Sequence, residues 1–368
     1  MTKRQSRASA AFSDKRLPGK PGDNLNMLEI DGSESHGGGS ILRIASGLAV
    51  LTQTPIRITN IRSGRKNPGI QEQHLAALRA LNSLCEGRMT GDEIGSKELE
   101  FFPNPIGKSM AEISISTAGS VALSLQPILI ASASVRHPVR LKITGGGTMG
   151  KWAPPFPFLE TVTFDMMKRM GYGIYSEVFR HGFYPKGGAS VSIEISPPQE
   201  ITPLKIPEPG RVLSVSGISI ESKSLSQGRV AERQKYACQQ MLEKYFEGSY
   251  IVKDFETEQV GTDSPGSCLT AWITRDNCVT GYGQVGEPGI RAEDIGRSVA
   301  ESIIRIYESG ATLDSHAADQ ILPFMLMAPG SVARIGEITG HMETSMWLSE
   351  KFLGRRFSID REGGIISS

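Results

Sequence analysis

The sequence has few of the features that define several protein classes. Its 368 residues include only four cysteines and six histidines, and aromatic side chains make up 7%. Forty Lys and Arg are balanced by 39 Asp and Glu, so the formal net charge is +1. Because no global positive field exists to wrap long nucleic acid, any nucleic-acid contact must be local. The cysteines show no CxxC spacing, and we expect them to be reduced.

Long apolar runs are also absent. No stretch approaches the roughly 20 apolar residues that a membrane span needs, and the N-terminus lacks the apolar segment of a secretory signal. We therefore expect a cytoplasmic protein with no membrane partner, of undetermined oligomeric state. Residues 1–26 carry six Lys and Arg and almost no large apolar side chains. They predict a disordered basic tail, either a solvated leader or a phosphate-seeking arm.

The chain does contain a regular alternation of strand-like and helix-like segments. Apolar side chains at helical spacing predict helices over residues 70–87 and 157–172, whereas residues 188–196 alternate as a strand. Residues 119–134 predict a buried helix interrupted at Pro127. The overall composition, 39% hydrophobic and 21% charged, is typical of a globular protein. The length suffices for about two domains.

Composition also divides the chain. A proline-rich stretch at residues 196–210 predicts a hinge, and the segment after it has polar strands and charged helices. We expect residues 208–311 to form an inserted α+β domain. The flanking segments, 27–207 and 312–368, then form two parts of one larger domain. Recurring glycine-punctuated loops in that domain favour internal structural repetition.

Glycines and arginines supply the first candidate ligand site. In "EIDGSESHGGGSILR" (29–43) a short strand leads into three glycines and then into a helix, an arrangement that can cradle phosphate with backbone N–H groups. A plain tight turn explains the same residues. Arg62 and Arg65 lie in a second glycine-broken loop, where they fit bidentate phosphate binding or a solvated basic loop. With Arg43, three arginines adjoin glycine turns.

The most distinctive run is "RHGFYPKGG" at residues 180–188. It resembles the "RHGFYPxGGG" signature of the RNA 3'-terminal phosphate cyclase family, with Ala189 ending the glycine run. The resemblance spans nearly all of residues 27–360, through "GGGSILR", "IRSGR", "SLQPIL", "APPFPF", "ADQILPFMLMA" and "GHMETSMWLSEKF" in that order. It implies an α/β (α+β) fold with a large domain of three repeated βαβαββ-like units, similar to enolpyruvate transferases, and a small inserted α+β domain.

The resemblance also implies an activity. Such enzymes use ATP to convert RNA 3'-phosphate ends to 2',3'-cyclic phosphates through a histidine–AMP intermediate and an RNA-adenylate. His341 matches the family nucleophile. A neutral imidazole nitrogen is nucleophilic, and a helix N-terminus disfavours ring protonation while attracting phosphate. Without the family context, a lone histidine would more often be structural.

Further roles follow from the same resemblance. Binding of ATP or its phosphates is implied for Arg43, Arg62, Arg65, Gln73, His74, Gln126, Pro154, Phe158, His316, Asp319 and Gln320. Pro154 and Phe158 would form an apolar wall for adenine. His316 stands where the family usually has tyrosine, and Met149 replaces a polar residue. Both departures fall near the expected nucleotide pocket, so substrate choice could differ.

His36 is the most consequential departure. Most family members have glutamate at this position, where it helps to hold a divalent metal, so the implied cofactors are ATP and Mg²⁺ or Mn²⁺. Imidazole favours softer ions than Mg²⁺. The metal preference could have shifted, Glu34 could supply the carboxylate, the reaction could be metal-poor and slow, or His36 could bind phosphate as an imidazolium. Two other functions stay open: a cyclase-like RNA-processing protein, and an enolpyruvyl transferase, which "RHGFYP" disfavours.

Overall fold

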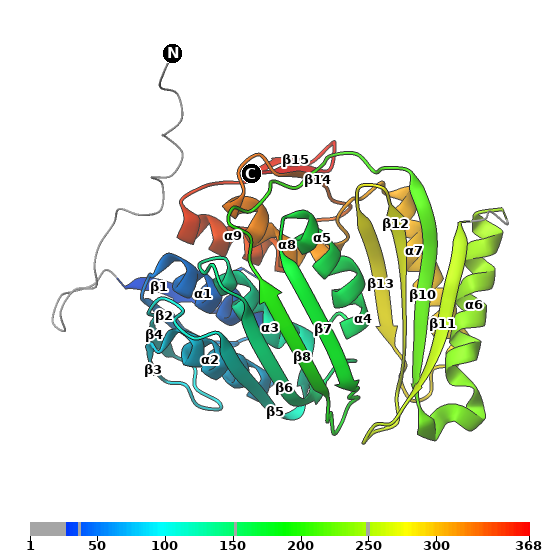
Figure 1. Cartoon of the computed structure of the whole chain (residues 1–368), viewed down its shortest axis with the longest axis horizontal. Helices are drawn as coiled ribbons and strands as arrows, with labels where there is room; N and C mark the ends of the chain where they lie inside the picture. The colour runs from blue at the N-terminus through cyan, green and yellow to red at the C-terminus, as the bar shows by residue number, and fades with distance from the viewer. Residues whose placement is uncertain (1–26, 36–37, 151–152, 248–250) are drawn as a thin grey trace, which may run out of the picture.

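The computed structural model describes residues 27–35, 38–150, 153–247 and 251–368 of the chain. These residues form four four-stranded sheets with helices packed on them (Figure 1). The first sheet and its helices comprise β1 (Leu28–Asp31), α1 (Gly39–Thr52), β2 (Ile56–Thr59), α2 (Glu72–Cys85), β3 (Arg88–Thr90) and β4 (Leu99–Phe102). The second comprises β5 (Met110–Ser120), α3 (Val121–Ser132), β6 (Val139–Gly147), α4 (Phe156–Phe158), α5 (Phe164–Arg169), β7 (Gly173–Arg180) and β8 (Ser190–Ser196).

The third sheet is interrupted in sequence. It comprises β9 (Lys205–Ile206), β14 (Val332–Arg334), β15 (Ser358–Asp360) and β16 (Ile365–Ser367), with α8 (Ser315–Met327) and α9 (Gly340–Leu353). The segment between β9 and α8 forms the fourth sheet and its helices: β10 (Val212–Ser222), α6 (Val230–Tyr245), β11 (Val252–Val260), β12 (Ser267–Arg275), β13 (Val279–Val285) and α7 (Ala292–Glu308).

Three of the sheets repeat one topology. The strand orders are β1-β2-β4-β3, β5-β6-β8-β7 and β9-β14-β16-β15. In each sheet the first two strands are parallel and the other two pairings are antiparallel. A helix follows each of the two parallel strands, which gives the βαβαββ unit three times. The predicted fold class and its repetition are therefore confirmed.

The inserted segment lies within the first crossover of the third unit. Its sheet packs against α6 and α7 around a separate apolar cluster that includes Val215, Leu242, Leu269 and Val299. The predicted hinge at residues 196–210 is wrong in one respect, because it contains β9, which pairs with β14 of the third unit. The domain boundaries at residues 207/208 and 311/312 stay a prediction.

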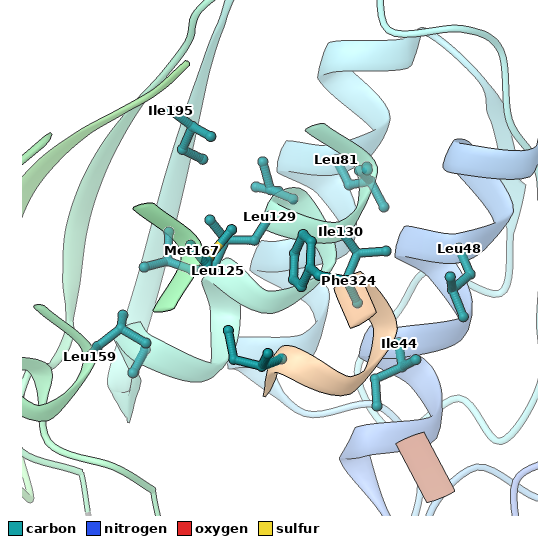
Figure 2. Packing of buried hydrophobic residues seen from close by; sticks show 14 of the residues in the cluster. Ile44, Leu48, Leu81, Leu125, Leu129, Ile130, Leu159, Met167, Ile195 and Phe324 are labelled. Atoms are coloured by element: carbon teal, nitrogen blue, oxygen red, sulfur yellow. The ribbon is translucent and has the colours of Figure 1, made fainter. Parts of the chain in front are cut away.

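The three units share one apolar core. Figure 2 shows Phe324 of α8 with Leu125, Leu129 and Ile130 of α3, and all four belong to one buried cluster with Ile44 of α1. α3 is mostly apolar and is buried on nearly every side, including at the polar residue Gln126. It runs through Pro127 without the predicted break. Helices α1 and α3 approach closely at Gly47, where an added Cβ would lie 2.7 Å from the Pro127 carbonyl oxygen.

Other expectations have mixed outcomes. The predicted helix at residues 157–172 contains a π-helical turn, Leu159–Thr163, between α4 and α5. All four cysteines are buried and free of disulfides, in agreement with the expected reduced state. Among the described residues, no helix combines the length and apolarity that crossing a membrane requires. The predicted disordered tail, residues 1–26, lies outside the described residues.

Candidate active site

The beginnings of several helices from all three units meet at one place. Gly39, the first residue of α1, lies against His74 of α2, and Oε1 of Gln73 accepts a hydrogen bond from the Ser120 backbone N–H at the start of α3 (2.7 Å). In the third unit, the Ser345 hydroxyl of α9 donates to the Asp319 carbonyl of α8 (3.1 Å). Helix N-termini carry unsatisfied N–H groups and partial positive charge, so this region favours anions.

Arg43 places a buried positive charge in this region. Its side chain comes from the first turns of α1 and is 6% exposed. Nε donates to Oε1 of Gln126 on α3 (3.0 Å). The pKa of Arg43 is lowered to about 10, chiefly by burial. Asp319 opposes the shift, and the positive charge of Arg62 adds to it. The guanidinium stays charged at neutral pH, and a buried cation of this kind gains strongly from an anionic ligand.

His74 is held as a neutral donor beside Arg43. It is 4% exposed, and burial, aided by Arg43 and Arg62, lowers its pKa to about 3. The Gln71 backbone N–H donates to Nδ1 (3.3 Å), so the ring proton is assigned to Nε2. Nε2 faces Gly39, where an added Cβ would lie only 2.2 Å away. Glycine is therefore required at position 39 to admit the His74 ring.

The two arginines of the 60–71 loop have different environments. Nη1 of Arg62 donates to the carbonyls of Asn67 (2.7 Å) and Gly69 (2.9 Å), which fixes the loop around it. Burial and the neighbouring Arg65 lower the pKa of Arg62. Arg65 is exposed, and its guanidinium lies against Gly38, 3.1 Å from where a Cβ would be. The predicted cluster of Arg43, Arg62 and Arg65 thus surrounds the start of α1.

Two buried polar atoms at the site have no hydrogen-bond partner in the described part of the chain. They are Nε2 of Gln126, the residue whose other amide atom holds Arg43, and Oδ1 of Asp319. Burial raises the pKa of Asp319, and His341, Arg43 and His316 oppose the rise in that order. Unpaired buried polar atoms are costly. A ligand that accepts a hydrogen bond from Gln126 would remove one such cost.

His341 is exposed at the second residue of α9. Thr339 caps this helix by accepting a hydrogen bond from the Met342 backbone N–H (3.3 Å). One turn later, the Thr344 and Ser35 hydroxyls lie 3.0 Å apart, which ties the loop after β1 to α9. His341 interacts electrostatically with Asp319, and so does Arg43, so the structure brings an accessible imidazole close to Asp319. Sequence reasoning missed Ser345 and Thr344, because their contacts come from other elements. It also missed Gln71, which caps α2 through His74 three residues later.

His316 lies between two aromatic rings. It packs edge-to-face with Phe158 (centroids 5.8 Å apart) and is stacked with Tyr282 of β13 (6.0 Å, 27°). Phe158 has no exposed surface and Pro154 is buried. The half-buried His316 packs on Phe158, and the adenine wall of Pro154 and Phe158 stays a prediction. Gln320 is buried beneath and donates to the His316 carbonyl (3.5 Å).

Of the two predicted metal ligands, only Glu34 lies within the described residues. Glu34 is exposed in the turn after β1, where its backbone N–H donates to the Asp31 carbonyl (3.1 Å). His36 lies outside the described residues. Within the described ranges there is no group of three or more His, Cys, Asp or Glu side chains that could hold a metal ion. The metal site stays a prediction.

Fold and site define an α/β protein whose repeated units surround a buried arginine, with an exposed histidine nearby at a helix start. A family model described as RNA 3'-terminal phosphate cyclase matches residues 34–359. The RNA 3'-terminal phosphate cyclase of Methanothermobacter thermautotrophicus is 38% identical over 339 residues, which cover 92% of this chain and 98% of that protein. That of Methanopyrus kandleri is 39% identical over 335 residues (89% and 94%). The chain belongs to the RNA 3'-terminal phosphate cyclase family.

Proposed function

We propose that this chain uses ATP to convert RNA 3'-phosphate ends to 2',3'-cyclic phosphates. The observation that carries the proposal is the exposed His341 at the start of α9, which interacts with Asp319. Asp319 also interacts with the buried Arg43, and both Asp319 and Gln126 have an unpaired polar atom within the described residues. A triphosphate supplies the negative charge that Arg43, Arg62 and the helix N-termini favour. Membership of the family and relatives of that name agree with this conclusion.

The proposed reaction has three steps. An unprotonated ring nitrogen of His341 attacks the α-phosphorus of ATP, and the bond to pyrophosphate breaks as the P–N bond forms. An oxygen of the RNA 3'-phosphate then attacks the same phosphorus, which breaks the P–N bond and gives RNA-adenylate. Finally the 2'-hydroxyl oxygen attacks the 3'-phosphorus, its proton is lost, and AMP leaves. Arg43 and Arg62 stabilise charge that develops on the phosphoryl oxygens.

The test is incubation of the full chain with α-labelled ATP, first alone and then with single-stranded RNA ending in a 3'-phosphate. We expect label on the wild-type protein and none on His341→Ala. With RNA, we expect the label to leave the protein and the RNA end to become resistant to phosphatase. Label that survives in His341→Ala would overturn the nucleophile assignment. Adenylation without phosphatase resistance would favour a relative that has lost the cyclisation step.

The metal and the compartment are also proposals. A divalent ion, Mg²⁺ or Mn²⁺, would neutralise triphosphate charge, and Glu34 offers an exposed oxygen ligand at the loop before α1. Adenylation measured with each ion in wild type and Glu34→Gln tests this, because an unchanged ion requirement in the variant would remove Glu34 as a ligand. Four buried, unpaired cysteines support a reducing compartment such as the cytoplasm.

A further inference from the structure

The loop that carries the "RHGFYPKGG" run, residues 180–188, is fixed to the second unit at its base. The Thr148 hydroxyl oxygen accepts a hydrogen bond from the Gly182 backbone N–H (3.1 Å) and lies 3.0 Å from Nδ1 of His181. Burial lowers the pKa of His181 to about 4, so the ring is neutral near pH 7. Thr148 itself is 1% exposed. The base of the loop is therefore a buried, hydrogen-bonded unit.

The inserted segment holds the same loop from the other side. Phe183 is 1% exposed, and its ring occupies the space where a Cβ at Gly266 would lie, 2.3 Å from the nearest ring atom. Arg180 forms an ion pair with Asp263. The Lys186 backbone N–H donates to the Ser264 hydroxyl (3.1 Å). These contacts leave the loop little freedom, because it is clamped between two sheets.

Tyr184 points away from this clamp. It is 73% exposed, the highest value among the large hydrophobic side chains in the described residues. The Gly187 backbone N–H donates to the Phe183 carbonyl (2.8 Å), which closes the turn that presents Tyr184 and the exposed Lys186. Of the two cations in the 180–188 run, Arg180 is paired with Asp263, and Lys186 is the exposed cation in the same turn as Tyr184. An exposed ring two residues from an exposed cation fits a nucleic-acid base with its phosphate, because bases stack on aromatic side chains.

Close backbone contacts connect this loop to the candidate active site. An added Cβ at Gly119 would lie 2.8 Å from Cβ of Gln73, and one at Gly146 would lie 2.8 Å from the Gly119 carbonyl oxygen. One at Gly187 would lie 2.6 Å from the Gly146 carbonyl oxygen. Only two backbone segments therefore separate the loop from Gln73. A strand whose 3' end is at the site can pass over the loop within a few nucleotides.

We propose that Tyr184 stacks on a base of the RNA strand a few nucleotides 5' of the reacting end, with Lys186 contacting a phosphate. The proposal rests on the proposed function, since that function supplies the single-stranded RNA. Stacking is sequence-tolerant because every base has a π-face. The contact would therefore retain RNA without selecting its sequence. A chain with a net charge of +1 has few other means of doing so.

The test compares binding of a 5'-fluorescein-labelled single-stranded 12-nucleotide RNA with a 3'-phosphate, by fluorescence anisotropy, to full-length variants. We expect Tyr184→Ala to raise the Kd roughly tenfold and Tyr184→Phe to bind like wild type, because the ring is retained. Lys186→Gln should weaken binding and reduce the salt slope by about 0.7. The matched control is Tyr175→Ala, which removes a tyrosine that is 67% exposed on β7, and its Kd should not change.

Protein adenylation with ATP alone separates this proposal from the proposed function. Tyr184→Ala should be adenylated at the wild-type rate, and a circular dichroism spectrum checks its fold. If wild type is not adenylated but Tyr184→Ala still binds the RNA tenfold more weakly, the reaction is wrong and the contact stands. A Kd for Tyr184→Ala within twofold of wild type overturns the contact. So does an equal loss in Tyr175→Ala or Tyr184→Phe, or failure of wild type to bind the RNA.

Discussion

Arg43 is a residue at which the stability of the fold and the binding of an anion make opposite demands. Its guanidinium is buried, hydrogen-bonded at Nε to Gln126, and lowered in pKa chiefly by burial. Desolvating a cation costs several kcal/mol, which partners recover only in part. The ligand-free protein therefore carries a cost that a bound phosphate would offset. A free-energy cost of this kind is expected at residues that serve binding rather than folding.

Replacing Arg43 with methionine should separate the two effects. Loss of the charge should lower the rate of protein adenylation by about 10²–10³-fold, the effect typical of removing a preorganised charge-stabilising group. The free energy of unfolding, measured in urea, should change little, because removing the buried charge offsets the loss of the hydrogen bond to Gln126. Arg79→Met, at an exposed position on α2, is the control and should change neither. A large loss of stability in Arg43→Met would show that the guanidinium is mainly structural.

Other single residues show the limits of local pattern. Met149 was expected near the nucleotide pocket, yet it is fully buried with Phe183, Ile220 and Cys268 between the second unit and the insert. Phe158 is likewise sealed from solvent. Neither burial is visible in the sequence, because Met149 packs in a cluster with Ile220 and Cys268, and Phe158 packs on His316, all more than 60 residues away in the chain. Arg43 and Gln126, in contrast, were predicted together from motif order and do meet.

At the scale of elements, a glycine decides how closely α1 packs on α3. These are the helices that follow the first strand of the first and second units. Gly47 lies in the middle of α1, where alanine would be about 1 kcal/mol more favourable by intrinsic propensity. A Cβ there would lie 2.7 Å from the Pro127 carbonyl and 3.0 Å from Cβ of Ile130. The backbone carbonyl cannot move as a flexible side chain can. The tertiary contact therefore outweighs helix propensity at this position.

We expect Gly47→Ala to destabilise the protein by about 1–3 kcal/mol, the range typical of overpacking a core. Chemical denaturation followed by far-UV circular dichroism measures this change. Gly64→Ala is the matched control, since nothing lies within 4 Å of a Cβ at that position, and it should change stability by less than about 0.5 kcal/mol. Equal stability of Gly47→Ala and wild type would contradict the close packing of α1 on α3.

At the scale of the whole molecule, a cleft of about 500 Å³ lies between the second unit and the inserted sheet. Carboxylates line both walls: Glu160 follows α4, and Asp254, Glu256 and Glu258 lie on β11. Burial raises the pKa of Glu160 and Glu258 adds to the rise, whereas the Ser176 hydroxyl and Lys168 oppose it. Burial and Glu256 raise the pKa of Glu258. The inserted segment therefore packs beside the second unit with carboxylates on both sides of the cleft.

A raised folded-state pKa sets the sign of a pH dependence. The folded protein holds the Glu160 proton to higher pH than the unfolded chain does, so stability falls as pH rises through the folded pKa. Glu160→Gln should therefore be more stable than wild type at pH 8, with the difference disappearing below the ordinary value of 4.5. Urea midpoints across this pH range measure it.

Ser176→Ala provides the opposite test at the same carboxylate. The substitution removes the 2.7 Å hydrogen bond that the Ser176 hydroxyl donates to Oε1 of Glu160. That hydrogen bond stabilises the charged carboxylate. Wild type should therefore exceed Ser176→Ala in stability most at high pH and least in acid. A constant difference between Glu160→Gln and wild type at all pH values would show that the cleft carboxylates do not destabilise the folded protein.

Sequence alone determined the alternation of elements, the family, the repeated α/β architecture and the residue types of the site, because these depend on local periodicity and on motif order. Only the tertiary structure decided that β9 belongs to the third unit, that Gly39 makes room for His74, and that His316 packs on Phe158. It also decided that Tyr184 is held out to solvent by contacts with two sheets. The physical reason is that burial, pKa and exposure depend on neighbours brought together from distant parts of the chain.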